Sequence, residues 1–86
     1  MEFEFDDAKS QSNKLKHGID FIEAQNLWED PELIVIPART HDEPRFVLIA
    51  VYGHETWSAI STHRNEVIRI ISVRRSRQNE KEIYQR

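Results

Sequence analysis

Residues 66–84 read Glu-Val-Ile-Arg-Ile-Ile-Ser-Val-Arg-Arg-Ser-Arg-Gln-Asn-Glu-Lys-Glu-Ile-Tyr. The first half of this stretch, residues 67–73, is rich in β-branched side chains and has no Gly or Pro, which predicts a buried strand. From Ser76 onward the composition favours a helix, and the Ser76 hydroxyl can cap its first N–H groups. Guanidinium groups gather where the strand meets the helix, an arrangement suited to holding phosphate. They belong to Arg74, Arg75 and Arg77.

The segments just before this stretch predict more strands of the same sheet. Apolar or alternating runs are separated by tight turns, and Pro37 ends the first run. Strands joined by such short turns must be antiparallel neighbours, because a parallel crossover needs about a dozen residues or more. The expected strands are residues 33–36, 46–52, 56–63 and 67–73, with a polar loop at 38–44 and turns at 53–55 and 64–66.

The N-terminal residues predict a short strand followed by a helix. Residues 3–5 alternate apolar and polar, and Asp6 can cap a helix that runs through Lys16 and closes at Gly18. The basic residues of the last turn complement the carbonyl end of the helix dipole, so they have a structural explanation. A functional role for Lys16 or His17 is the alternative.

A second helix is expected after Gly18. Asp20 and Glu23 form a capping box, and Ile19 can pack against Ala24 as a hydrophobic staple. This helix should place an apolar stripe on the core and stop before Pro31.

The expected architecture is an α+β domain that spans residues 1–86. An antiparallel sheet of about four strands carries two N-terminal helices and one C-terminal helix. Because the C-terminal helix offers only Ile83 and Tyr84 as apolar contacts, part of one sheet face should stay open. Such a face could serve as a working surface or as a docking site.

Composition narrows the possible functions. The chain has no Cys, only two Gly and four His without ligand spacing, so we expect no metal, no cofactor and no glycine-rich phosphate loop. No apolar run approaches the roughly 20 residues of a membrane span, and the acidic start is unlike a signal peptide, so we expect a soluble cytoplasmic protein. The histidines are His17, His41, His54 and His63.

The net charge of −3 conceals an uneven distribution. Residues 1–43 have four Lys or Arg against eleven Asp or Glu, a net −7, whereas residues 44–86 have eight against four, a net +4. The basic half alone is compatible with nucleic acid. An acidic and a basic solvated face is the other interpretation.

The cationic residues predict metal-free RNA cleavage. This reaction needs a base for the 2′-OH proton, cations to stabilise the phosphorane and an acid for the leaving oxygen. Arginine supplies the cations, and histidine or a phenol can carry the protons. The catalytic candidates are Arg69, Arg74, Arg75, His63 and Tyr84, with His54 as another possible proton carrier. The RNA-binding candidates are Lys16, His17, Arg64 and Arg77.

Strand alternation limits how the arginines can be grouped. On an unbroken strand Arg69 and Arg75 share one face, and Arg74 lies on the other unless a bulge intervenes. In a purely structural interpretation, Arg69 pairs with Glu66 or Glu55 and His63 is a polar strand end.

Three spaced motifs extend through nearly the whole chain. They are Phe3-x-Phe-Asp-x-x-Lys9, Asn13-x-x-Lys16-His17-Gly18-Ile19-x-Phe21-x-x-Ala24 and Ile68-Arg69-Ile70-Ile71-Ser72-x-Arg74-Arg75-x-x-x-x-Glu80-x-x-x-Tyr84. With these motifs the chain resembles the BrnT family of toxins from bacterial toxin–antitoxin pairs. The positions matched are Lys16, His17, Arg69, Ser72, Arg74, Arg75, Glu80 and Tyr84.

The resemblance implies a RelE-like fold, ribonuclease activity that arrests translation and growth, and a BrnA-like antitoxin that binds DNA. A 2:2 heterotetramer with the antitoxin is one assembly that it allows. We expect the antitoxin to cover the region from Arg69 to Arg75 with acidic segments, and this chain to reach DNA only through the antitoxin. The alternative is a non-catalytic module that only binds a partner chain.

Overall fold

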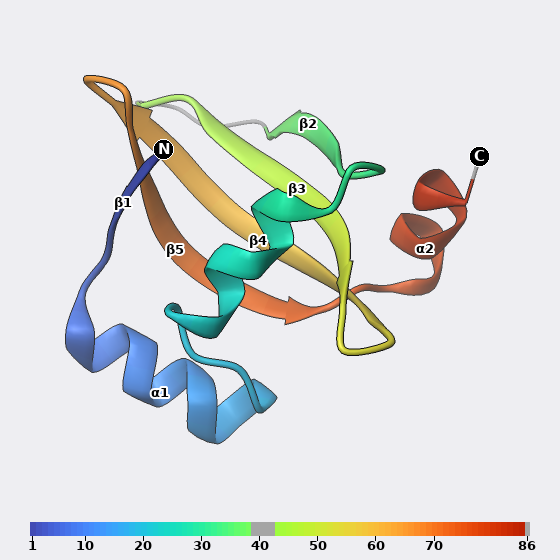
Figure 1. The fold of residues 1–86 in the computed structure, drawn as a ribbon, viewed down its shortest axis with the longest axis horizontal. Helices are drawn as coiled ribbons and strands as arrows, with labels where there is room; N and C mark the ends of the chain where they lie inside the picture. The colour runs from blue at the N-terminus through green and yellow to red at the C-terminus, as the bar shows by residue number, and fades with distance from the viewer. Residues whose placement is uncertain (39–42, 86) are drawn as a thin grey trace.

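The structure, a computed structural model, describes residues 1–38 and 43–85. The predicted loop at 38–44, with His41, lies largely outside these residues. The α+β class is confirmed, because the described strands form one sheet and the helices lie beside it (Figure 1). The described elements are β1 (Glu2–Glu4), α1 (Asp7–His17), η1 (Glu23–Glu29), β2 (Ile34–Ala38), β3 (Arg45–Tyr52), β4 (Glu55–Arg64), β5 (Val67–Arg75) and α2 (Gln78–Tyr84).

The sheet has five strands in the order β1-β5-β4-β3-β2 and is mixed rather than purely antiparallel. Strands β2 to β5 are antiparallel neighbours and lie within two residues of their predicted bounds. The expectation of about four antiparallel strands is wrong because β1 runs parallel to β5. Almost the whole domain connects these two strands, so the argument from short turns does not apply to them. Pro37 lies inside β2, where an edge strand tolerates its missing N–H.

A β-bulge interrupts the pairing of β4 with β5. Ile60 pairs with Ser72, but the next residue of β4, Ser61, pairs with Ile70. Ile71 is therefore the extra residue on β5. Bulges of this kind redirect the side chains that follow them.

The bulge changes which arginines share a face of the sheet. Arg69 pairs with Thr62 and Arg74 pairs with Ser58, so their partners are an even number of residues apart on β4. Arg69 and Arg74 therefore lie on the same face, and Arg75 lies on the other. The grouping of Arg69 with Arg75 that simple alternation predicts is wrong.

Helix α1 closes the edge of β5 that β1 leaves free. The Asn13 side chain donates to the carbonyl of Val73 (2.9 Å) and accepts from its N–H (3.1 Å), as a neighbouring strand would. The same amide donates to the carbonyl of Ile19. The predicted caps of α1 are confirmed, since Asp6 accepts from the N–H of Lys9 and Gly18 has φ 83°. Helix α1 is thereby fixed beside the bulge.

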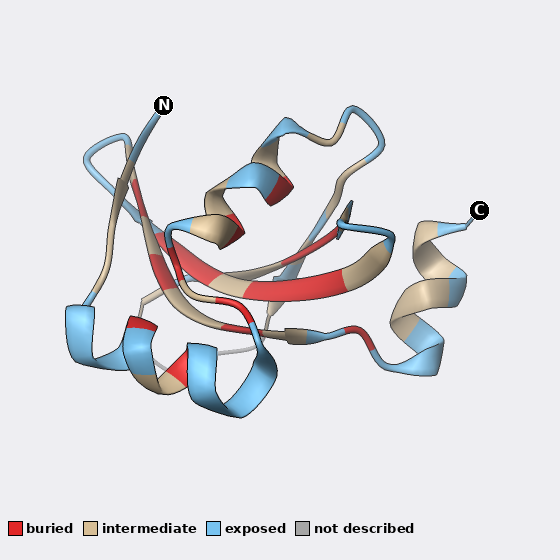
Figure 2. Cartoon of the chain, turned by 60° about the horizontal axis from the view of Figure 1, so that its bottom comes forward, coloured by how far each residue is buried: buried red, intermediate tan, exposed pale blue. Residues whose placement is uncertain are grey.

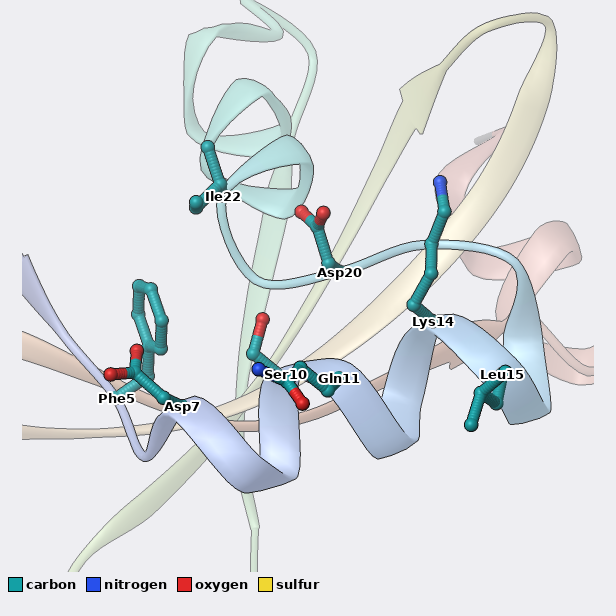
Figure 3. A pocket seen from close by; sticks show the side chains of 8 residues that line it. All are labelled: Phe5, Asp7, Ser10, Gln11, Lys14, Leu15, Asp20 and Ile22. Atoms are coloured by element: carbon teal, nitrogen blue, oxygen red, sulfur yellow. The ribbon is translucent and has the colours of Figure 1, made fainter.

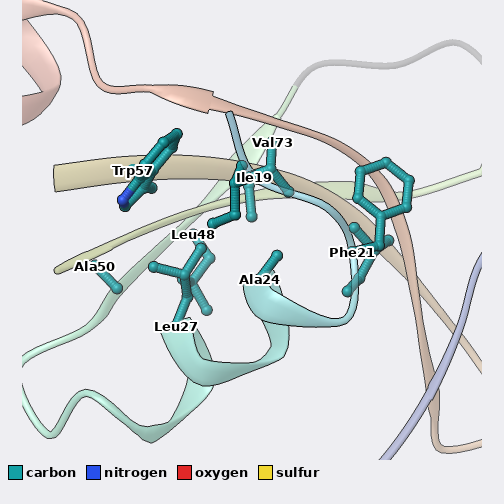
Figure 4. Close-up of a cluster of buried hydrophobic side chains, with 10 residues drawn as sticks. Ile19, Phe21, Ala24, Leu27, Leu48, Ala50, Trp57 and Val73 are labelled. Atoms are coloured by element: carbon teal, nitrogen blue, oxygen red, sulfur yellow. The ribbon is translucent and has the colours of Figure 1, made fainter. Parts of the chain in front are cut away.

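The core fills the space between η1 and one face of the sheet, here called the η1 face (Figures 2 and 4). The capping box is confirmed, because Asp20 accepts from the N–H of Glu23 (2.7 Å) and Glu23 accepts from that of Asp20 (3.3 Å). The segment that follows is a 3₁₀ helix, not the α-helix that its spacing suggests. The buried cluster consists of Ile19, Phe21, Ala24, Leu27, Leu48, Ala50, Trp57, Ala59, Ile70 and Val73.

Helix α2 lies apart from α1, toward the opposite end of the sheet (Figures 1 and 2). Its N-cap is Arg77, whose N–H donates to Glu80 at 2.7 Å, so the prediction of Ser76 as the cap is wrong. Ser76 is buried instead, with its hydroxyl 2.8 Å from that of Ser58. The first helix turn is thus held by a carboxylate that also contacts β5.

Candidate functional site

A hollow of about 180 Å³ lies where α1 meets the bulge of β5. We call it the α1–β5 pocket. It is lined by Lys9, Ser12, Asn13, Lys16, His17, Ile71 and Ser72.

Two local features bring these side chains together. On α1, residues 9, 12, 13 and 16 share one helical face, because neighbours on a helix surface are three or four positions apart. On β5, the bulge at Ile71 displaces the alternation so that Ser72 lies on the same sheet face as Arg74. The hydrogen bonds of Asn13 to Val73 fix the helix against the strand. The pocket therefore joins residues far apart in the chain.

The basic residues of the α1–β5 pocket have no ion-pair partner in the described part of the chain. Lys9, Lys16 and His17 are exposed, and none of the ion pairs found within residues 1–38 and 43–85 involves them. Among the residues that the structure describes, no Asp or Glu lines the hollow. Ammonium groups beside hydroxyl and amide groups can bind a phosphate, and an imidazole can transfer a proton at it.

The predicted catalytic arginines do not form one cluster. Arg69 and Arg75 are six residues apart on β5, on the order of 20 Å along an extended strand. Arg69 lies 3.7 Å from Glu4, a different carboxylate from the Glu66 or Glu55 considered from the sequence. Arg75 does approach Glu55, at 3.6 Å, and its guanidinium lies over the Trp57 ring at 5.6 Å.

Arg74 is held by a nearly buried carboxylate. Its guanidinium donates two hydrogen bonds to Glu80, at 2.7 and 2.9 Å. These bonds, with others from the Arg77 N–H and the Ser58 hydroxyl, lower the pKa of Glu80 to about 2 against the opposing effect of partial burial. The pair fixes the position of Arg74 on the same sheet face as Ser72.

Tyr84 connects α2 to the segment after η1. Its hydroxyl donates to Asp30 at 2.6 Å, and this bond together with burial raises the pKa of Tyr84 to about 12. Partial burial alone would raise the pKa of Asp30, but hydrogen bonds from Tyr84, Val51 and Glu32 outweigh it and lower that pKa. A phenol held in this way is a poor general acid near neutral pH.

The remaining candidates are spread over the sheet. The His63 ring lies 4.8 Å from that of Phe46, and Arg64 pairs with Glu43 at 3.0 Å, both near the end of β4. His54 occupies a turn with φ 69°, and Arg77 is exposed at the start of α2. Of the four RNA-binding candidates, the structure brings together Lys16 and His17 only.

Sequence reasoning missed the contributions of Lys9 and Ser12 to the site. Both face the pocket because they lie seven and four positions before Lys16, a spacing visible in the sequence once the helix is assumed. Lys9 also belongs to the first of the three family-like motifs. The proximity of Ser72 to these residues has no local sequence signal, since it depends on how α1 packs on β5.

Two further observations concern only the part of the chain that the structure describes. It contains no group of three or more His, Asp or Glu side chains that could hold a metal ion. None of its helices is long and apolar enough to cross a membrane.

Comparison with known proteins identifies a family. Residues 5–80 match the model of the ribonuclease toxin BrnT of type II toxin–antitoxin systems. The match includes every residue that lines the α1–β5 pocket. No curated protein matches the chain.

Proposed function

The chain belongs to the BrnT family of ribonuclease toxins of type II toxin–antitoxin systems, and from this we propose that it is a metal-independent endoribonuclease that arrests translation. The α1–β5 pocket is the observation that supports this proposal most directly. It gathers two exposed lysines, hydroxyl groups and one imidazole on a surface large enough for a phosphodiester. These groups match the requirements of RNA cleavage by attack of the 2′-OH on phosphorus.

Four residues of the pocket have roles in the proposed reaction. Lys9 and Lys16 attract the phosphate and stabilise the negative charge of the phosphorane. His17 removes the proton of the 2′-OH as that oxygen bonds to phosphorus, and water protonates the 5′-oxygen as its bond to phosphorus breaks. The Ser72 hydroxyl donates a hydrogen bond to a phosphate oxygen.

Arg74 extends this site along β5. It shares a sheet face with Ser72 and is two residues away, about 7 Å along the strand. Glu80 holds the guanidinium in place without closing it off, since 24% of the Arg74 side chain is exposed. Arg74 is therefore positioned to bind the next phosphate of the RNA. Arg69, on the same face, would bind a more distant one.

The partner is a protein antitoxin, as membership of a type II system requires. We propose that this antitoxin is BrnA-like, that it forms a cytoplasmic complex with the toxin, and that a 2:2 heterotetramer is the assembly to test first. In this proposal the antitoxin alone contacts operator DNA.

Cleavage of RNA by the purified chain tests the catalytic proposal. We expect the wild-type protein to cut RNA in excess EDTA, and Lys16→Ala and His17→Ala each to lower the rate, His17→Ala by about 100-fold. Lys14→Ala is the matched control, because Lys14 lies on the same helix but pairs with Glu23 at 2.6 Å, outside the α1–β5 pocket. This control should cleave at the wild-type rate.

Growth after induction gives a second readout. The wild-type chain should arrest growth, whereas the folded His17→Ala variant should not. A wild-type protein that is folded yet leaves both RNA and growth intact would favour the non-catalytic binding module instead. Full activity in the Lys16 and His17 variants would move the site away from this pocket.

A further inference from the structure

A second hollow lies on the other side of α1, between that helix and the segment that leads into η1 (Figure 3). Its volume is about 490 Å³. We call it the α1 groove. It is lined by Phe5, Asp7, Ser10, Gln11, Lys14, Leu15, Asp20 and Ile22.

The apolar surface of the α1 groove is unusually accessible. Leu15 is 90% exposed and Ile22 is 67% exposed, and both line this one hollow. Neither side chain belongs to the buried core, so the fold does not explain why large apolar residues occupy these positions. Exposed apolar groups along the edges of one hollow are typical of a protein interface.

The charges at the rim of the groove define the chemistry of its partner. Asp7 and Asp20 contribute carboxylates, and the charge of Lys14 is already matched by Glu23 at 2.6 Å. The rim is therefore net acidic. An occupant that fills the groove with an apolar side chain and flanks it with Lys or Arg would match both the shape and the charge.

A second copy of this chain fits the groove poorly. Outside the groove, the described chain exposes three large apolar residues, Met1, Val35 and Val51, and two of them lie beside carboxylates: Met1 adjoins Glu2, and the N–H of Val51 donates to Asp30 at 2.9 Å. Such surfaces would bring acidic groups to an acidic rim, and like charges disfavour association. The protein antitoxin that the family requires is the better occupant.

We propose that the antitoxin anchors itself in the α1 groove through an apolar side chain flanked by basic residues. The proposal needs the antitoxin partner of the proposed function but not its catalytic residues. On α1 the groove-lining positions 7, 11 and 14 face away from the pocket-lining positions 9, 13 and 16. The anchor therefore binds the side of α1 that is opposite Lys16. An antitoxin held there can extend across α1 to cover the RNA site.

The test measures affinity for the purified protein antitoxin of this toxin–antitoxin system. Leu15→Ser and Ile22→Ser should each weaken binding at least ~10-fold, as loss of an interface anchor does. The matched control is Val35→Ser, which removes an apolar side chain that is 47% exposed outside the groove. Asp7→Asn should weaken binding less than the two serine variants do. Its effect should be larger at low salt than at high salt, because salt screens the charge of Asp7.

Other measurements separate the possible outcomes. Because Leu15 and Ile22 are exposed, their variants should keep the wild-type melting temperature and RNA cleavage rate while escaping neutralisation in cells. Unchanged antitoxin affinity in both variants overturns the proposal. The proposal is also overturned if the Leu15 and Ile22 variants lose self-association but keep antitoxin binding, because this result would identify a second copy as the occupant. Failure of the catalytic proposal would instead appear as absent cleavage by the wild type.

Discussion

The Glu80 carboxylate connects the end of β5 to the start of α2 through hydrogen bonds. One of its oxygens accepts from Arg74, from the Arg77 N–H and from the Ser58 hydroxyl, and the other accepts a second bond from Arg74. Its side chain is only 12% exposed. Four donors to one carboxylate explain why the ionised form is strongly favoured in the folded protein.

Replacing this carboxylate should make stability depend on pH in a specific way. We expect Glu80→Gln to destabilise the protein at pH 7 by about 2 kcal/mol, because hydrogen bonds to a charged group are lost. The pKa of Glu80 is lowered to about 2, so its contribution is complete above the ordinary value of 4.5 and disappears as the pH falls toward 2. The difference between wild type and variant should therefore shrink over that range, as urea unfolding can measure.

The control for this experiment is Glu82→Gln. Glu82 lies on the same helix and is exposed, so the substitution should change the free energy of unfolding by less than about 0.5 kcal/mol. A Glu80→Gln penalty that stays constant from pH 7 to pH 3 would contradict the charged network.

At the scale of elements, α2 is the least firmly attached helix. None of its residues is buried, and besides the Glu80 network its side-chain hydrogen bond to the rest of the described chain is that from Tyr84 to Asp30. A helix held by few contacts opens locally at a lower free energy than the sheet.

Tyr84→Phe should loosen α2 without unfolding the domain. Loss of the hydrogen bond to Asp30 should lower the free energy of opening α2 by about 1–2 kcal/mol. We therefore expect faster amide hydrogen exchange in α2, with the exchange rates of β4 and β5 unchanged. In the wild type the bond raises the pKa of Tyr84 to about 12, so its contribution is present below pH 10 and is lost as the pH rises through 12. Gln85→Ala, next to it and exposed, is the matched control. Equal acceleration in β5 would mean that α2 supports the whole fold.

Local chemistry was enough to predict most elements. Each helix cap depends only on residues within one turn of the capping residue. The hydrogen bonds confirm the caps at Asp6 and Gly18 and the capping box at Asp20. The bulge at Ile71 and the parallel pairing of β1 depend on distant partners. No pattern within the strand itself reveals them.

The candidate site was predictable only in part, for the same reason. Lys16 and His17 were recognised as candidates, but their meeting with Ser72 requires the packing of α1 against β5. Arg69 and Arg75 were grouped on the assumption of regular alternation, which one extra residue reverses. Carboxylate partners from other strands and helices, such as Glu4 and Glu80, were also out of reach of local reasoning.

At the scale of the whole molecule, charge is divided between the halves of the chain. Residues 1–43 have a net charge of −7 and residues 44–86 of +4. Several basic groups of the second half are paired with carboxylates, among them Arg64, Arg69 and Arg75. These ion pairs leave the second half of the chain less able to attract DNA phosphates than its net charge suggests.

We expect the isolated chain not to bind operator DNA, and the complex to bind it through the antitoxin. Electrophoretic mobility shifts with each protein alone and with the complex, at low and high salt, check this expectation. Specific, salt-sensitive binding by the 86-residue chain alone would reverse the assignment of roles. An antitoxin that loses operator binding when the toxin is removed would show a shared DNA surface instead.

The hydrogen bonds from Asn13 to Val73 join residues 60 positions apart, and β1 likewise pairs with the distant strand β5. A growing chain emerges N-terminus first, so α1 has no strand edge to pack on until β5 has been made. The α1–β5 pocket, which needs both partners, cannot exist on an incomplete chain. In the proposed function, the chain therefore cannot cleave RNA until β5 has been made and α1 has packed on it, which leaves time for an antitoxin already present in the cell to bind the chain as it folds.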